Sequence, residues 1–261
     1  MQNRSLPHPP EWYTISYSLG FMLKRKRLLG WSLLLFLATV GITAAGFDLS
    51  TDYIDSIAGQ FLSSPPDSST IWGMVKYKAW TAGKYLFLII TRIVSFYLAF
   101  LIAYCLTSPG YVFLSIAAEK IHAGKEFIPD ENISIKYILL DLFEGIKIGL
   151  FGVIITVVAL MMNFIPLIGQ AAVFLVYTYY SALMFIDYPA SRKHWSLGQK
   201  IGWIRNHSSD AFRLGLVPAI ISMIPLLNIF LLSLLFPLLT IHSTLNFCAI
   251  EYADANQQMK S

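Results

Sequence analysis

The sequence predicts an all-α integral membrane fold with two long spanning helices and two helical hairpins. Hydrophobic residues make up 56% of the chain and charged residues only 13%, whereas soluble domains are about one quarter charged. The apolar residues form long runs without charge: Leu28–Phe47, Ile93–Ala118, Ile148–Ile186 and Leu214–Ile250. These runs lack the alternation of barrel strands, and a backbone in lipid must form a helix or a closed barrel. Helices are therefore predicted, with short amphipathic interfacial helices between them.

The first part of the chain sets the predicted orientation. A polar segment, 1–27, ends in Lys24, Arg25, Lys26 and Arg27, and aspartates but no basic residues follow the span 28–47. Basic residues favour the cytoplasmic side, so the N-terminus is predicted to be cytoplasmic and the loop Asp48–Thr70 to be outside. In an alternative, 28–47 would be a cleaved signal sequence, but the polar segment before it is long for one.

The second span is predicted at 85–106, and it returns the chain to the cytoplasm. Residues 107–147 are predicted to be cytoplasmic and interfacial, because Asn132–Lys147 places its isoleucines and leucines on one helical face. The amphipathic stretch Trp195–Arg205 has the same character.

The last two apolar runs are predicted to be hairpins, at 148–186 and 214–250. As one helix, Ile148–Ile186 would be about 58 Å long, roughly twice the membrane core. Helix breakers interrupt both runs, and the candidate hairpin tips are Pro166, Gly169 and Gln170 in the first run and Pro225 in the second. Asn228, close to Pro225, is a candidate residue of a solute pathway. The arm Leu214–Ile224 would reach only about 16 Å. The second hairpin is therefore interpreted as re-entrant, while the first is either re-entrant or an ordinary pair of spans.

The ends of the hairpins are alike. One run ends in Ile186-Asp187-Tyr188 and the other in Ile250-Glu251-Tyr252, which indicates a repeated unit. The basic loop 187–213 between the hairpins is predicted to be cytoplasmic, and so is the tail 251–261.

Several polar residues are candidates for a solute pathway. Arg92 lies within a predicted span, where a charge is costly and faces a partner, a cavity or the interface. His242 and Asn246 share one helical face, which either lines a polar path or joins helices by hydrogen bonds. Lys24–Arg27 either collect anions at the cytoplasmic mouth or only fix the topology. The basic residues of 187–213 either attract anions by their field or contact anionic lipids.

Three motifs in order resemble one known family. They are Phe164–Gln170, Asp187-Tyr188-Pro189 and Ile224–Asn228, with Pro109 and Gly124 before them. This pattern is similar to the CysZ sulfate permeases, within the family of etoposide-induced membrane proteins. The resemblance implies two long spanning helices, two half-penetrating hairpins and sulfate transport. Where that family carries Gly-Leu-x-x-Glu, this chain has Val112–Ile116, which leaves the substrate open.

The sequence favours transport over catalysis. It contains no hydrolase, nucleotide-binding or Cys-x-x-Cys motif, and its five histidines lack metal spacing. We therefore expect a non-enzymatic protein without cofactor or metal, in the inner (plasma) membrane with both termini cytoplasmic. Its expected partners are the lipid bilayer, a small inorganic anion and further copies of itself in a homo-oligomer, and no nucleic acid. The predicted function is a passive or ion-coupled, sulfate-like anion channel or permease. The alternative is a membrane scaffold without transport.

Overall fold

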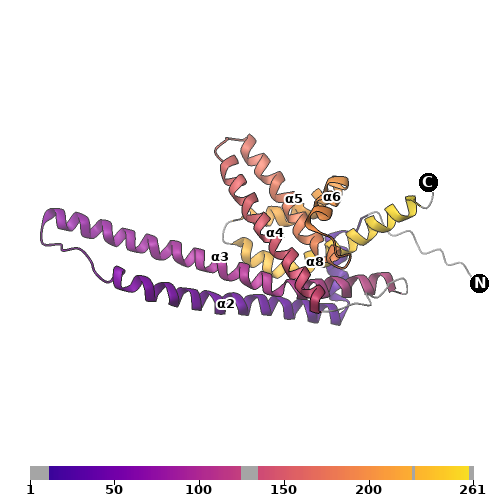
Figure 1. The fold of residues 1–261 in the computed structure, drawn as a ribbon, viewed down its shortest axis with the longest axis horizontal. Helices are drawn as coiled ribbons and strands as arrows, with labels where there is room; N and C mark the ends of the chain where they lie inside the picture. The colour runs from indigo at the N-terminus through magenta and orange to yellow at the C-terminus, as the bar shows by residue number, and fades with distance from the viewer. Residues whose placement is uncertain (1–11, 125–134, 225–226, 259–261) are drawn as a thin grey trace, which may run out of the picture. The chain divides into compact units, whose positions relative to one another are not determined.

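A computed structural model describes residues 12–124, 135–224 and 227–258, and these residues form helices and connecting turns without a strand (Figure 1). The helices are α1 (Ile15–Leu23), α2 (Lys26–Leu62), α3 (Ile71–Ala123), α4 (Ile135–Met162), α5 (Ile168–Ser191), α6 (Leu197–Asn206), α7 (Ser208–Ser222) and α8 (Leu227–Gln258). Five of them contain a stretch long and apolar enough to cross a membrane. The predicted all-α membrane fold is thereby confirmed.

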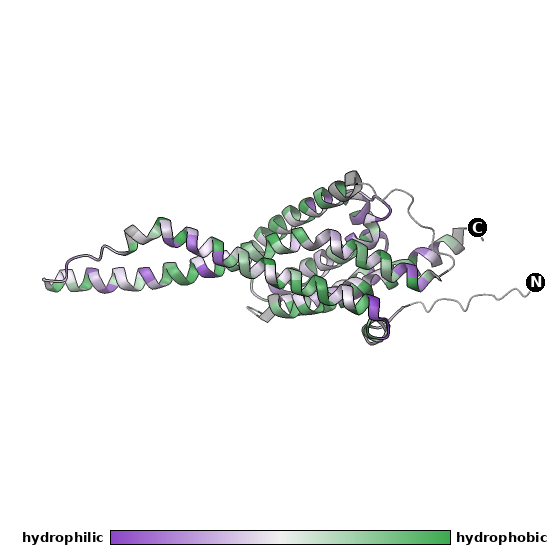
Figure 2. Ribbon diagram, turned by 90° about the horizontal axis from the view of Figure 1, so that it is seen from below, coloured by the Kyte–Doolittle hydropathy of each residue, from purple (hydrophilic) through white to green (hydrophobic). Residues whose placement is uncertain are grey.

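The outer surface of these helices is strongly apolar. Many large hydrophobic side chains are exposed, among them Leu160, Phe164 and Leu167. Figure 2 shows apolar residues on the outside of the helices and not only where helices pack together. A surface of this kind is stable against lipid tails, whereas in water it would promote aggregation.

The chain divides into two compact units. Unit 2 is Leu37–Leu106, and unit 1 combines Met1–Phe36 with Thr107–Ser261. In unit 2, α2 and α3 form an antiparallel pair that narrows at Gly46, where an added Cβ would lie 3.1 Å from the Cβ of Ala99. Small residues permit this close approach. The turn ends on Thr70, whose hydroxyl accepts a hydrogen bond from the Gly73 amide at 3.0 Å and so caps α3.

Both long helices continue beyond the predicted spans. The segment Asp48–Thr70 was predicted to be a loop, but it is helical up to Leu62. Helix α3 continues past Leu106 to Ala123 and includes Pro109. The first span was predicted to end where Asp48 begins the acidic stretch, but a charged side chain on a helix surface does not end the helix. The second was predicted to end at Leu106, before Pro109, but α3 continues through this proline.

The core of unit 1 forms where α5, α7 and α8 meet. Ala182, Ile186, Ala211 and Phe247 are buried there together with Trp203 of α6. Helices α5 and α7 touch backbone to backbone, because a Cβ added at Gly215 would overlap the carbonyl oxygen of Thr178. Small residues on both helices make this contact possible.

The first hairpin turns tightly between α4 and α5. Its amides bond to carbonyl oxygens within the turn, such as Ile165 N to Met162 O at 3.0 Å and Gly169 N to Ile165 O at 3.0 Å. Backbone carbonyl oxygens therefore supply partners for these amides of the turn. Leu167 takes a positive φ of 64°, a conformation that side chains rarely adopt.

The second hairpin has one short arm. Helix α7 has 15 residues and would measure about 22 Å, less than the bilayer core. Pro225 lies outside the described residues, and so does the side chain of Asn228. The predicted amphipathic stretch Trp195–Arg205 is helical as α6, which begins with a capping box between Ser196 and Gln199.

Candidate functional site

An ion pair joins the two helices of unit 2. Arg92 of α3 donates from Nη2 to Oδ2 of Asp55 on α2 at 2.6 Å. The two side chains are 37% and 49% exposed, so the pair lies at the surface of the unit. A charge within a span was expected to face a partner, a cavity or the interface, and the partner of Arg92 is an aspartate on the neighbouring helix.

Two buried polar atoms of α3, one of them in the Arg92 side chain, have no hydrogen-bond partner in the part of the chain that the structure describes. They are Nη1 of Arg92 and Oγ of Ser95, and Ser95 is only 1% exposed. The two residues are three positions apart and therefore share one face of α3. Buried polar atoms normally have partners, and each exception calls for an explanation such as a water or an ion.

The basic residues before the first span have structural contacts. Lys24 caps α1 through its backbone amide. The Arg25 guanidinium lies 3.6 Å from the centre of the Phe21 ring and donates to the Phe21 carbonyl at 3.0 Å. Lys26 and Arg27 open α2. In the described residues this cluster forms the turn from α1 into α2.

His242 and Asn246 attach the N-terminal segment to α8. The Asn246 side chain accepts from the Tyr13 amide at 2.8 Å and donates to the Tyr13 carbonyl at 3.1 Å. His242 Nδ1 lies 3.0 Å from the Ser18 hydroxyl. Burial, together with the neighbouring Tyr17, raises the pKa of Tyr13. Of the two sequence interpretations, this geometry favours the joining of helices by hydrogen bonds.

The basic residues of 187–213 are largely paired with acids. Arg192 pairs with Glu119 at 2.9 Å, Lys193 with Glu251, Lys200 with Asp187 at 2.6 Å and His207 with Asp254 at 2.9 Å. Opposite charges at contact largely cancel each other's field beyond the pair. This loop therefore presents a weaker positive field than its sequence indicates.

The most deeply buried of these pairs was not anticipated. The side chains of Lys200 and Asp187 are 0% and 7% exposed. Helix α6 is held on a second side by Trp203, whose indole donates to Glu251 at 2.9 Å. Asp187 and Glu251 are the acids at the two repeated hairpin ends, Ile-Asp-Tyr and Ile-Glu-Tyr. The repeated pattern was the sequence signal for these contacts, because the acidic residue of each copy binds a residue of α6.

The described residues contain no group of three or more histidine, cysteine or acidic side chains arranged to hold a metal ion. The candidate site consists of the Arg92 guanidinium, the Ser95 hydroxyl and the Asp55 carboxylate of unit 2.

Comparison with known families agrees with this architecture. Residues 15–233, most of the chain, match the family described as Sulfate transporter CysZ/Etoposide-induced protein 2.4. The chain belongs to this family. A search of curated proteins gives no match.

The remaining predicted residues lie in the stretch Val112–Ile116 and at the tip of the first hairpin. In the stretch Val112–Ile116, which differs from the sulfate permeases, Ser115 is buried and its hydroxyl lies 2.8 Å from that of Thr244 on α8. In this chain the stretch therefore packs α3 against α8. At the first hairpin tip Pro166 and Gln170 are exposed. Gly169 is buried, and a Cβ there would overlap the Met162 carbonyl oxygen.

Proposed function

We propose that this protein forms a passive or ion-coupled pathway for a small, sulfate-like inorganic anion. The observation that carries the proposal is that Nη1 of Arg92 and the hydroxyl of Ser95, one turn apart on α3, are buried and have no hydrogen-bond partner among the described residues. A guanidinium presents planar N–H donors that match the oxygens of an oxyanion, and a hydroxyl adds one more donor. Membership in a family that includes the sulfate transporter CysZ supports this substrate class.

Asp55 suits a pathway better than a tight binding site. Its carboxylate offsets the charge of Arg92 at 2.6 Å, so an anion is attracted less strongly than it would be by an unpaired guanidinium. Conduction requires a site that binds well enough to admit an ion and weakly enough to release it. A guanidinium shared between Asp55 and a passing anion meets both conditions.

The proposed pathway is shared between copies in a homo-oligomer. Asp48, Asp52 and Asp55 follow one another at helical spacing on α2, and Asp48 and Asp52 are exposed. Asp48, Asp52 and Asp55 belong to a candidate membrane span, where charged side chains face protein or a wet cavity. A second copy against this face supplies that environment. We also propose an inner-membrane location with both termini cytoplasmic.

Sulfate flux into liposomes that contain the purified protein tests the function. We expect flux above that of empty vesicles and a loss of about tenfold in Arg92→Gln, the effect of one charge-assisted hydrogen bond. Lys78→Gln, which changes an exposed lysine of the same helix, should keep the flux. Flux equal to that of empty vesicles would remove sulfate transport from consideration.

A second function is favoured by the remaining candidate residues. His242 and Asn246 are engaged in contacts within the protein, and so are most cations of 187–213. This suits a membrane scaffold without transport, neither an enzyme nor a nucleic-acid-binding protein. Flux at the level of empty vesicles for sulfate and for other inorganic anions would favour the scaffold.

A further inference from the structure

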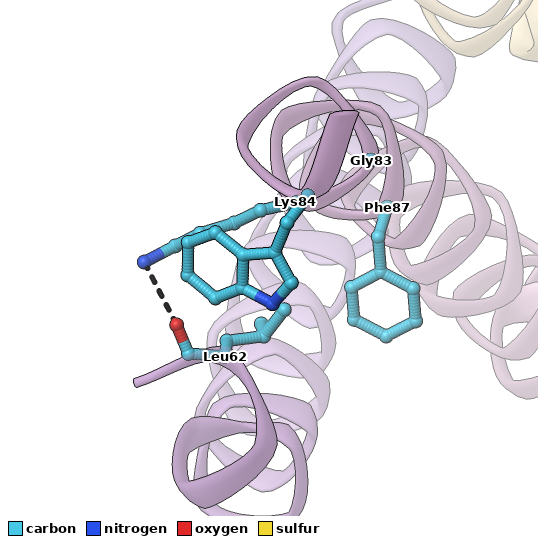
Figure 3. Close-up of a pocket in the computed structure, with 5 residues that line it drawn as sticks. Leu62, Gly83, Lys84 and Phe87 are labelled. Atoms are coloured by element: carbon cyan, nitrogen blue, oxygen red, sulfur yellow. Dashed lines mark hydrogen bonds between the residues drawn. The ribbon is translucent and has the colours of Figure 1, made fainter. Parts of the chain in front are cut away.

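Unit 2 contains a pocket near the end of its helix pair. Its volume is about 330 Å³, and its walls are Leu62, Trp80, Gly83, Lys84 and Phe87. Figure 3 shows Lys84 reaching across to the main-chain carbonyl of Leu62, to which it donates at 3.2 Å, while Phe87 lies on another side. The Lys84 ammonium also lies 5.3 Å from the centre of the Trp80 ring. The pocket is thus apolar, with one fixed cation.

Exposed lysines interrupt the apolar surface of α3 close to this pocket. On one side Tyr85, Leu86 and Ile89 are exposed by 62%, 59% and 57%, as expected of residues that face lipid tails. On the other side the lysines Lys76 and Lys78 are exposed among exposed hydrophobic side chains, of which Ile71 and Trp72 are the most exposed. Tryptophan, tyrosine and lysine gather where a membrane meets water. The pocket therefore lies on the part of α3 that suits the level of lipid headgroups.

We propose that this pocket binds an anionic phospholipid, with an acyl chain between Trp80 and Phe87 and the headgroup phosphate on the Lys84 ammonium. The walls match an acyl chain, because four of the five lining residues offer no charged group. The ammonium has three N–H donors, of which the Leu62 carbonyl takes one. Two donors are left for phosphate oxygens.

A second lysine extends the part of the site that would bind the anionic headgroup. Lys76, Trp80, Lys84 and Phe87 are spaced by three or four positions and form one stripe on α3. Lys76 is exposed one turn beyond Trp80 and is positioned to contact the outer part of a headgroup. Two lysines on one stripe favour a negatively charged headgroup over a zwitterionic one.

Matched variants separate this site from general attraction to lipid. A Cβ added at Gly83 meets no atom within 4 Å, and Gly83 lines the pocket, so Gly83→Leu is the variant chosen to occupy the pocket. Gly41→Leu is its control, because Gly41 lies in the same unit and is equally open. Lys84→Gln removes the cation, and Lys78→Gln removes one that lies off the stripe.

The measurement is native mass spectrometry of the purified protein titrated with phosphatidylglycerol in mixed micelles. We expect one tightly bound lipid per chain and about tenfold weaker binding in Lys84→Gln and Gly83→Leu, the loss of one charge-assisted contact. Both controls should bind as the unaltered protein does. Phosphatidylcholine should bind more weakly, and glycerol phosphate should not compete.

Three outcomes would overturn the proposal. Equal loss in Lys78→Gln would show attraction to charge in general. Competition by glycerol phosphate would show an anion site without a lipid chain. Unchanged binding in Gly83→Leu, with the helical content confirmed by circular dichroism, would place the lipid outside the pocket. Because Arg92 and Ser95 are left intact in every variant, none of these results depends on the proposed anion pathway.

Discussion

The Lys200 ammonium lies 2.6 Å from the Asp187 carboxylate, and both side chains are almost completely buried. This pair ties α6 to α5, and the Trp203–Glu251 hydrogen bond ties α6 to α8. Helix α6 therefore contacts the ends of both hairpins through an ion pair and a hydrogen bond. The repeated acidic residue after each hairpin, together with its partners on α6, is the main polar connection in this part of the protein.

Breaking this pair should destabilise the protein strongly. Lys200→Met leaves the Asp187 carboxylate buried without its partner, which costs roughly 3–5 kcal/mol. Thermal unfolding in detergent, followed by circular dichroism, should show a large fall in Tm. Combining Lys200→Met with Asp187→Leu removes both charges and should restore much of the lost stability.

An exposed pair provides the control for that experiment. Asp210 and Arg213 are 3.8 Å apart, and Arg213 is 59% exposed. Asp210→Asn should therefore change stability by less than about 1 kcal/mol. Equal effects of Lys200→Met and Asp210→Asn would contradict the importance of the buried pair.

Helices α5 and α7 should not tolerate a methyl group at Gly215. Gly215→Ala would drive a Cβ into the Thr178 carbonyl, and overpacking of this kind costs about 1–3 kcal/mol. Gly202→Ala on α6 meets no atom within 4 Å and should be neutral or stabilising by up to about 1 kcal/mol. Comparison of the two Tm values checks this, and equal values would mean that α5 and α7 are further apart.

Removing the Asn246 side chain should release the N-terminal segment. Asn246 makes hydrogen bonds to both backbone groups of Tyr13, and each such bond is worth about 1 kcal/mol. Amide hydrogen exchange in α1 should therefore be roughly thirtyfold faster in Asn246→Ala, because about 2 kcal/mol is lost. Asn206→Ala, at an exposed position, is the control. Slower anion flux with unchanged exchange would instead assign Asn246 to the pathway.

Cysteine labelling should show that the turn between α2 and α3 and the start of α7 lie on opposite sides of the membrane. Ser68 and Ser209 are both exposed, and Ser209 avoids the capping box at Ser196. In a background with Cys105 and Cys248 replaced by alanine, an impermeant reagent added outside should label residue 68 but not residue 209. The charge bias across the first span is the reason. Labelling of both positions from outside would mean mixed orientation.

Apolar runs in the sequence allowed the helices to be located, although not their full lengths. Leu28–Phe47 contains no charge and is helical throughout, but α2 continues through Asp48, Asp52 and Asp55 to Leu62. A run without charge predicts where lipid surrounds a helix. It does not predict where the helix ends, because that depends on capping and on the neighbouring helix.

Site residues were harder to predict, because their roles depend on partners far away in the chain. Arg92 was identified from its charge within a span, whereas its partner Asp55 is 37 positions earlier. Asn246 was considered for a polar path, but the segment that it binds is 233 positions away. The side chains alone are compatible with either role.

The sequence by itself determined that this chain is a helical membrane protein. Its long runs without charge are suited to lipid, and a helix in lipid forms all of its backbone hydrogen bonds within itself. The sequence also indicated the two hairpin turns through Pro166 and Pro225. The tertiary structure decided which charges are neutralised. Lys200, Arg192 and Lys193 form a basic cluster in the sequence, yet each contacts an acid on another helix. The field around a charge depends on distances in space, and only packing sets those distances.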